Sequence, residues 1–261
     1  MGALVFDVQP GCSMLNASAC AQAAVLAYSD EAAIEEGARA LGFDRVRPFR
    51  RGANYAAVLV REDVIVVAFR GTDDWGDWLT NLNVLFKKSP LGYVHRGFMK
   101  ATESFWPEIA AYVREVRTRD QTVWVTGHSL GGALAVLASI KLYVEDGIPI
   151  AGLYTFGQPP VGTLGFGSRF TDRCSFGLYR FVNHTDAVSD VPILGREHMG
   201  TVRYFDVSGK LWEGRPPWKV AMMDHWRAPQ KFGGLSQFLA HSMATYVELI
   251  AGQLTNTSPR G

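Results

Sequence analysis

The sequence is poor in cysteine and contains no spacing of metal-binding residues. Only Cys12, Cys20 and Cys174 occur in 261 residues. No CxxC pair or Cys/His ligand spacing is present, so a disulfide framework and a structural zinc site are both disfavoured. The odd number of thiols slightly favours a reducing compartment and leaves open whether Cys12 and Cys20 pair.

The chain also lacks an excess of charge of one sign, a long apolar run and a visible leader. Its formal net charge is +1 at pH 7, which argues against a nucleic-acid partner, because phosphate binding needs clustered basic residues. The densest basic stretch, RVRPFRR at residues 45–51, is isolated, and a solvated loop explains it as well as a binding partner would. No segment approaches the roughly 20 apolar residues of a membrane helix. The first residues lack the pattern of a secretory signal, so both a cytoplasmic protein and a secreted mature form remain open.

The order of apolar patterns predicts an α/β fold in one domain covering residues 1–261. No repeat, low-complexity tract, linker or obligate protein partner is indicated. Apolar runs rich in β-formers alternate with helical periodicity, which predicts a mostly parallel central sheet flanked by helices on both faces. Strands are expected at 55–60, 64–69, 123–126, 150–156, 179–182 and, at an edge, 202–207. Helices are expected at 13–28, 31–40, 97–116, 130–143 and 235–249, and a loop at 208–234.

The sequence GHSLG at residues 127–131 places a serine at the junction of a predicted strand and a predicted helix. Glycines on both sides allow strand and helix to pass closely, and the sharp turn presents the hydroxyl at the carboxyl edge of the sheet. The helix N-terminus then offers N–H groups to a developing oxyanion. Ser129 is therefore the predicted nucleophile, the alternative being a serine that only caps the helix. His128 is expected to be a packed histidine.

A serine nucleophile requires an imidazole base and a carboxylate that orients it. In G-x-S-x-G hydrolases the acid and then the histidine follow the serine along the chain. The stretch FVNHTDAVSDVP ends a predicted strand and offers Asp186 and Asp190. Among the downstream histidines, the residues themselves favour His241, just inside the final predicted helix, over His225 and His198.

Several stretches together resemble the class 3 lipase family of α/β-hydrolases. They are VVAFRGTDDWGDWLTNL, VHRGF, VTGHSLGGALAVLAS, TFGQPPVG, FVNHTDAVSDVP and AHSMATYVEL. They occur in the family's order from about residue 66 to residue 249. The resemblance implies the α/β-hydrolase fold, with Ser129 as nucleophile, Asp186 as acid and His241 as base. Asp190 stands where the family varies.

The resemblance also implies an oxyanion hole and a lid. Thr72 would donate through its backbone N–H and hydroxyl, and Leu130 through its backbone N–H. An ST-turn or helix-cap role for Thr72 is the alternative. A short lid helix is implied at about residues 73–86, whereas a fixed helix packed on the core would have the same apolar stripe. That stripe consists of Trp75, Trp78, Leu79, Leu82 and Phe86.

The expected function is a serine hydrolase that cleaves carboxylic esters of acylglycerols through an acyl-enzyme on Ser129. The expected partner is a lipid or ester substrate at a lipid–water interface, and a triad of this kind needs no metal or other cofactor. The same triad serves phospholipase A1, phenolic-acid (feruloyl-type) esterases and transacylases, and a non-catalytic binding module would keep the same scaffold. The Trp- and Met-rich segment 208–235 is either a satellite hydrophobic cluster or a wall of the acyl pocket.

Overall fold

The computed structural model describes residues 2–9, 11–71, 85–184, 186, 188, 196–220, 222 and 241–257. Most of the predicted lid, the loop carrying His225, and Asp190 lie outside these residues.

An eight-stranded sheet forms the centre of the molecule, in the order β1-β2-β3-β6-β7-β9-β11-β12. The run β3-β6-β7-β9-β11 is parallel, whereas β1, β2 and β12 join antiparallel at the two edges. The predicted mostly parallel sheet is therefore confirmed. The strands are β1 (Arg45–Arg51), β2 (Asn54–Val60), β3 (Val64–Phe69), β6 (Thr122–His128), β7 (Gly152–Phe156), β9 (Leu178–Asn183), β11 (Thr201–Phe205) and β12 (Leu211–Glu213).

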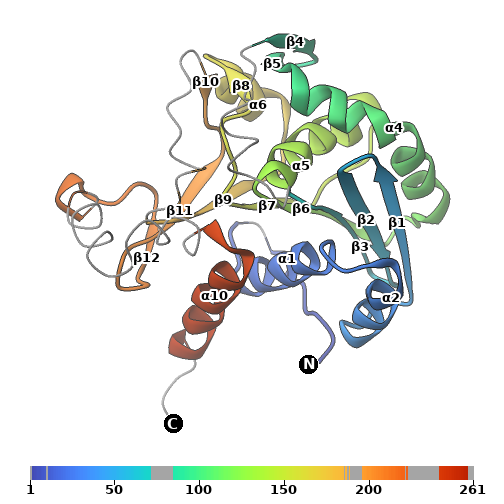
Figure 1. Cartoon of the computed structure of the whole chain (residues 1–261), viewed down its shortest axis with the longest axis horizontal. Coiled ribbons are helices and arrows are strands. Elements are labelled where there is room, and N and C mark those ends of the chain that lie inside the picture. The colour runs from blue at the N-terminus through green and yellow to red at the C-terminus, as the bar shows by residue number, and fades with distance from the viewer. Residues whose placement is uncertain are drawn as a thin grey trace.

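The strand order determines which helices cover which face. The parallel strands are added in one direction along the sheet, so right-handed crossovers place all their helices on the same side. That side carries α4 (Arg96–Val116), α5 (Leu130–Ile140) with its π-helical extension η1 (Lys141–Glu145), and α6 (Phe166–Arg173). The opposite face is covered by helices from the two chain ends, α1 (Met14–Leu26), α2 (Glu31–Ala40) and α10 (Met243–Thr257) (Figure 1).

The central strands are buried on both faces and divide their side chains between two hydrophobic layers. In β3 every residue is buried. Ile65 and Val67 pack into the layer beneath α4 and α5, whereas Val64 and Val66 pack into the layer beneath α1 and α10. This alternation follows from the two-residue period of a strand. It explains why the sequence of β3 reads as a continuous apolar run.

A second, four-stranded sheet lies beside the main one and was not predicted. Its order is β10-β8-β5-β4, with strands β10 (Arg196–Glu197), β8 (Gly162–Thr163), β5 (Gly92–His95) and β4 (Phe86–Ser89). Phe86 lies in β4, so its assignment to the apolar face of a lid helix is wrong. The strands of two to four residues are too short to give a periodic signal in the sequence.

Four other expectations are corrected. Residues 45–51 form edge strand β1 rather than a loop, because Phe49 packs into the core while the arginines face outward and Pro48 is tolerated at an edge. The strand predicted at an edge, β11, is covered by β12, which lies within the predicted loop 208–234. The final helix, α10 (Met243–Thr257), extends beyond its predicted end at residue 249, whereas residues 235–240 of the predicted range lie outside the described residues.

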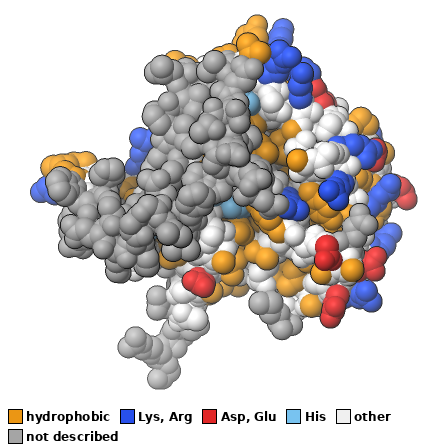
Figure 2. Space-filling model, in the orientation of Figure 1, with side chains coloured by type: hydrophobic (Ala, Val, Ile, Leu, Met, Phe, Trp, Pro, Cys, Tyr) orange, Lys and Arg blue, Asp and Glu red, His pale blue; other side chains and the backbone are white. Residues whose placement is uncertain are grey.

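Charges of both signs are interspersed on the surface around β1, β2 and α4 (Figure 2). Ion pairs there join Arg51 to Glu108 and Arg114 to Asp146. No helix within the described ranges has the length and apolarity needed to cross a membrane. All three cysteines are free thiols, so Cys12 and Cys20 do not pair in this structure.

Candidate active site

Ser129 occupies a strained backbone position between β6 and α5. Its φ and ψ are 57° and −129°, and it is the only residue other than glycine with positive φ in the described part of the chain. Such a conformation costs on the order of 1–3 kcal/mol and persists only where the surroundings impose it. Here the Ser129 N–H donates to the carbonyl of Phe156 on the neighbouring strand, at 2.9 Å. The buried Oγ has no hydrogen-bond partner within the described residues.

Two glycines make this turn sterically accessible. A Cβ atom at Gly127 would collide with the backbone carbonyl of Gly131, and one at Gly131 would collide with the carbonyl of Phe69 at the end of β3. Strand β6, helix α5 and strand β3 therefore approach one another at backbone distance. The close passage expected from the GHSLG sequence is present, and it explains the need for glycine at both positions.

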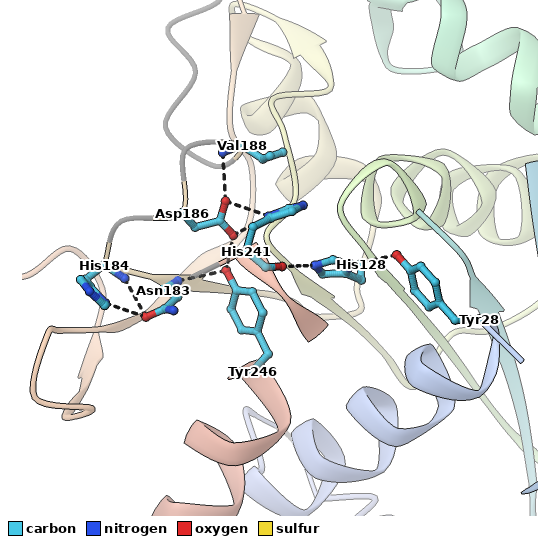
Figure 3. Close-up of polar contacts among 8 residues, drawn as sticks. All are labelled: Tyr28, His128, Asn183, His184, Asp186, Val188, His241 and Tyr246. Atoms are coloured by element: carbon cyan, nitrogen blue, oxygen red, sulfur yellow. Dashed lines mark hydrogen bonds and ion pairs between the residues drawn. The ribbon is translucent and has the colours of Figure 1, made fainter. Parts of the chain in front are cut away.

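His241 and Asp186 form a buried pair close to this turn (Figure 3). The Nδ1 of His241 lies 2.9 Å from each carboxylate oxygen of Asp186. Both side chains are almost inaccessible, with exposed fractions of 3% and 0%. Gly157, which follows Phe156, packs against both of them, because a Cβ there would lie 2.6 Å from Asp186 Oδ2 and 2.9 Å from His241 Nδ1. Ser129 and the pair thus contact adjacent residues, Phe156 and Gly157, at the carboxyl end of β7.

The carboxylate of Asp186 is held in its charged form by several donors. The backbone N–H of Val188 donates to Oδ1 at 2.9 Å, and the hydroxyl of Tyr246 donates to Oδ2 at 2.6 Å. Burial alone would raise the pKa of Asp186, but the charge and hydrogen bond of His241 and the bond from Tyr246 outweigh it and lower the pKa below its usual value. The structure therefore presents an ionised acid to Nδ1 of His241.

His128, the neighbour of Ser129, is buried and hydrogen-bonded on both ring nitrogens. Its Nε2 lies 2.6 Å from the backbone carbonyl of His241, and its Nδ1 lies 2.9 Å from the hydroxyl of Tyr28. Burial, together with the adjacent His241, lowers the pKa of His128 to about 3. Because a carbonyl can only accept, the neutral ring must carry its proton on Nε2 and accept at Nδ1. The expected packed histidine is thus confirmed, with a defined tautomer.

The family model described as "Lipase (class 3)" matches residues 66–195, a stretch that contains the serine turn and Asp186. The chain belongs to the class 3 lipase family. The "Secreted mono- and diacylglycerol lipase 1" of Fusarium solani is 36% identical over 162 residues, covering 59% of this chain and 47% of that protein. The chloroplastic "Phospholipase A(1) DAD1" of Arabidopsis thaliana is 27% identical over 234 residues, covering 77% of this chain and 52% of that protein.

A solved triacylglycerol lipase, described as having a serine-protease triad at its catalytic centre, has a similar fold. It superposes with a TM-score of 0.63 at 25% identity, covering 75% of this chain and 82% of that chain. The architecture is the α/β-hydrolase fold, as predicted. The chain spans about half the length of the two curated relatives named above.

Not every residue predicted from the class 3 lipase resemblance is described. Leu130 is the first residue of α5, so its N–H is among those without an intrahelical acceptor. Thr72 and the lid residues Trp75, Trp78, Leu79 and Leu82 lie outside the described residues, as do His225 and Asp190. His198 follows β10 in the small sheet, whereas the histidine paired with Asp186 is His241, two residues before α10.

Sequence reasoning missed two tyrosines that are hydrogen-bonded to residues of this candidate site. Tyr246 bonds Asp186 and also accepts the backbone N–H of Asn183 at 3.0 Å, and Tyr28 bonds His128. Buried tyrosine hydroxyls need partners, but their identity depends on contacts 60 and 100 residues apart in the chain. Within the described residues no group of three or more His, Cys, Asp or Glu side chains is arranged to hold a metal ion.

Proposed function

We propose that this chain is a serine hydrolase that cleaves carboxylic esters of acylglycerols through an acyl-enzyme on Ser129. The observation that carries the proposal is a strained, buried Ser129 whose N–H bonds Phe156, next to the Gly157 against which the buried His241–Asp186 pair packs. Membership of the class 3 lipase family and the acylglycerol lipase among its relatives support the choice of substrate. The proposal also treats residues 1–261 as one catalytic domain.

In the proposed reaction, Ser129 Oγ attacks the ester carbonyl while its proton passes to Nε2 of His241. The new C–O bond forms as the carbonyl π-electrons move onto oxygen. Collapse of this tetrahedral intermediate expels the alcohol, which takes the proton from His241. Water then attacks the acyl-enzyme with the same proton transfers and releases the fatty acid. Asp186, kept ionised by its donors, steadies the imidazolium in both halves of the cycle.

The oxyanion would be held where α5 begins and β3 ends. The N–H of Leu130 stands at the N-terminus of α5, where the helix dipole favours negative charge. Thr72 follows Gly71, and a Cβ atom at Gly71 would lie only 3.0 Å from Cβ of Ser129. Thr72 is therefore next in sequence to a residue in contact with the nucleophile, which supports it as the second donor.

Replacing Ser129 with alanine tests the proposal directly. We expect Ser129→Ala to lose at least about 10⁴-fold in kcat on p-nitrophenyl butyrate, because the nucleophile is removed while binding is kept. A fluorophosphonate should label Ser129 in the wild type, as read by peptide mass spectrometry.

A matched control is Ser139→Ala. Ser139 is also fully buried and lies in α5, where its Oγ donates to the carbonyl of Ala135, so its loss should leave turnover and labelling intact. Labelling of a different residue, or normal turnover by Ser129→Ala, would contradict the proposal.

Phospholipase A1 activity is the second candidate, favoured by the relative from Arabidopsis thaliana whose match extends over 234 residues. The two activities differ in the head group accepted next to the same acyl ester. Comparing hydrolysis of a diacylglycerol and a phosphatidylcholine that carry identical acyl chains separates them. Similar rates on both substrates would mean that the head group does not determine the specificity of this enzyme.

A further inference from the structure

A chain of hydrogen bonds connects the catalytic histidine to the end of β3 through two residues outside the proposed triad. The N–H of Gly71 donates to the hydroxyl of Tyr28 at 3.0 Å. The Tyr28 hydroxyl lies 2.9 Å from Nδ1 of His128, and Nε2 of His128 lies 2.6 Å from the carbonyl of His241. Tyr28, just beyond α1, thereby contacts Gly71 and His128, the residues that precede Thr72 and Ser129, and His128 carries the connection on to His241 (Figure 3).

Each of these three hydrogen bonds has a fixed donor and a fixed acceptor. The carbonyl of His241 can only accept, so Nε2 of His128 donates. The neutral ring must then accept at Nδ1, so the Tyr28 hydroxyl donates there, and the same oxygen accepts from Gly71. A reversal at any link would set two donors or two acceptors against each other. The arrangement therefore specifies one orientation for each group, which a set of van der Waals contacts would not do.

The two ends of this chain of hydrogen bonds lie at groups that the proposed reaction needs to keep in a fixed position. At one end, the bond to the His241 carbonyl holds the backbone from which the base projects, and the His128 and His241 rings lie with centroids 4.6 Å apart. At the other end, Gly71 immediately precedes Thr72. A Cβ at Gly71 would lie 2.6 Å from the Tyr28 hydroxyl and 2.8 Å from the His128 carbonyl, so the chain just after β3 packs closely against both residues.

We propose that Tyr28 and His128 are positioning residues that hold the base and the oxyanion-binding segment in register around Ser129. The inference rests on the proposed hydrolase function. Neither residue exchanges a proton with the substrate: they act through the backbone of His241 and of Gly71. Misplacement of catalytic groups by a fraction of an ångström lowers the rate of the chemical step while leaving substrate binding almost unchanged.

The test compares Tyr28→Phe with Tyr154→Phe. Tyr154 is the control because its hydroxyl, like that of Tyr28, accepts a backbone N–H, that of Ser13 at 3.1 Å. Tyr154 is fully buried and Tyr28 only partly. Turnover of p-nitrophenyl butyrate is divided by the number of sites titrated with a fluorophosphonate, which corrects for misfolded protein. We expect Tyr28→Phe to lose about 10-fold in kcat per titrated site with KM within about 2-fold. Tyr154→Phe should keep its kcat per site even if its melting temperature falls.

A second pair of variants tests the direction of the bonds. His128→Gln keeps a donor near the position of Nε2, whereas His128→Leu removes it. The Gln variant should therefore retain about 10-fold more kcat per site than the Leu variant. Equal values for the two, or equal values for Tyr28→Phe and Tyr154→Phe, would overturn the proposal.

A readout independent of turnover separates this inference from the proposed function. The proton on Nδ1 of His241, bonded to Asp186, is followed by NMR as a far-downfield resonance. We expect it to shift in Tyr28→Phe and to stay in place in Tyr154→Phe. If the wild type shows this pattern of shifts but is inactive and is not labelled by the fluorophosphonate, hydrolysis is refuted and the positioning role is kept. If the resonance does not move in Tyr28→Phe, the positioning role is refuted.

Discussion

At the scale of single residues, the site depends on which groups are charged. Asp186 is ionised although it is fully buried, because His241, Tyr246 and the Val188 N–H all point at its carboxylate. His128 is kept neutral a few ångströms away, with a pKa of about 3. A charged His128 would need an acceptor at each ring nitrogen, whereas its ring nitrogens face one acceptor, the His241 carbonyl, and one donor, the Tyr28 hydroxyl. The neutral His128 ring therefore leaves His241 as the ring beside Asp186 that would carry a positive charge during the proposed reaction.

The low pKa of His128 predicts a specific dependence of stability on pH. An unfolded histidine binds a proton near pH 6.5, whereas folded His128 does so only near pH 3. Between these values the unfolded state holds the extra proton, so the free energy of unfolding falls as the pH falls, by at most about 1.4 kcal/mol per pH unit. Urea titrations between pH 6.5 and 4.5 should thus show that the free energy of unfolding falls more steeply with falling pH in the wild type than in His128→Gln.

The titratable groups that face His128 are His241, Asp186, Tyr28 and Tyr246. All four are present in both proteins, so the comparison isolates the His128 proton. If the free energy of unfolding falls equally steeply with pH in the wild type and the variant, His128 is already protonated in the folded protein over this pH range.

Residue by residue, the sequence predicted the groups with a chemical motif and missed the groups that only position them. Ser129 is identifiable because a strand–turn–helix junction with paired glycines has few other uses. The Asp186–His241 pairing was predicted from the resemblance and from chain order, and the two side chains are indeed bonded. Tyr28 and Tyr246 carry no local signal, because a tyrosine in a helix or beside one is equally compatible with plain core packing.

At the scale of elements, the junction of β6 and α5 determines where the nucleophile stands. A Cβ at Gly127 would overlap the Gly131 backbone, so the strand and the helix would have to separate. We expect Gly127→Ala to destabilise the fold by about 3 kcal/mol or more, since backbone atoms cannot move aside as a side chain can.

Gly252→Ala provides the matched control for this substitution. Gly252 lies inside α10 with nothing within 4 Å of an added Cβ, so alanine there should stabilise the protein by about 0.4–1 kcal/mol. Both changes are measured by urea unfolding followed by circular dichroism. A Gly127→Ala protein as stable as the wild type would show that the junction tolerates displacement of α5.

Long periodic elements were predicted well, and short or context-dependent ones were not. The predicted range of α2 agrees with the structure at both ends, and α4 begins one residue earlier than predicted. The missed strands are β1, β4, β5, β8, β10 and β12. They share a physical cause: each is a strand because of the partner beside it rather than because of its own composition. An arginine-rich segment such as β1 becomes a strand when one residue, Phe49, has a core to enter.

At the scale of the whole molecule, two hydrophobic layers share a single sheet. The layer beneath α4 and α5 contains Cys174, and the layer beneath α1 and α10 contains Cys20. Helices α1 and α10 come from opposite ends of the chain and pack side by side on the second layer. The central strands send alternate side chains into both layers, so losing either layer exposes one face of the same strands. This coupling supports the treatment of residues 1–261 as one domain.

The two buried thiols test that coupling within one experiment. If the layers unfold together, Cys20 and Cys174 should become reactive at the same urea concentration, because two-state unfolding exposes both at once. Brief alkylation at increasing urea, followed by peptide mass spectrometry, gives a midpoint for each thiol. Cys12 is only partly buried and should react at lower urea, which verifies that the reagent is effective under native conditions. Exposure of Cys20 before Cys174 would instead mean that the helices from the chain ends detach while the crossover layer remains folded.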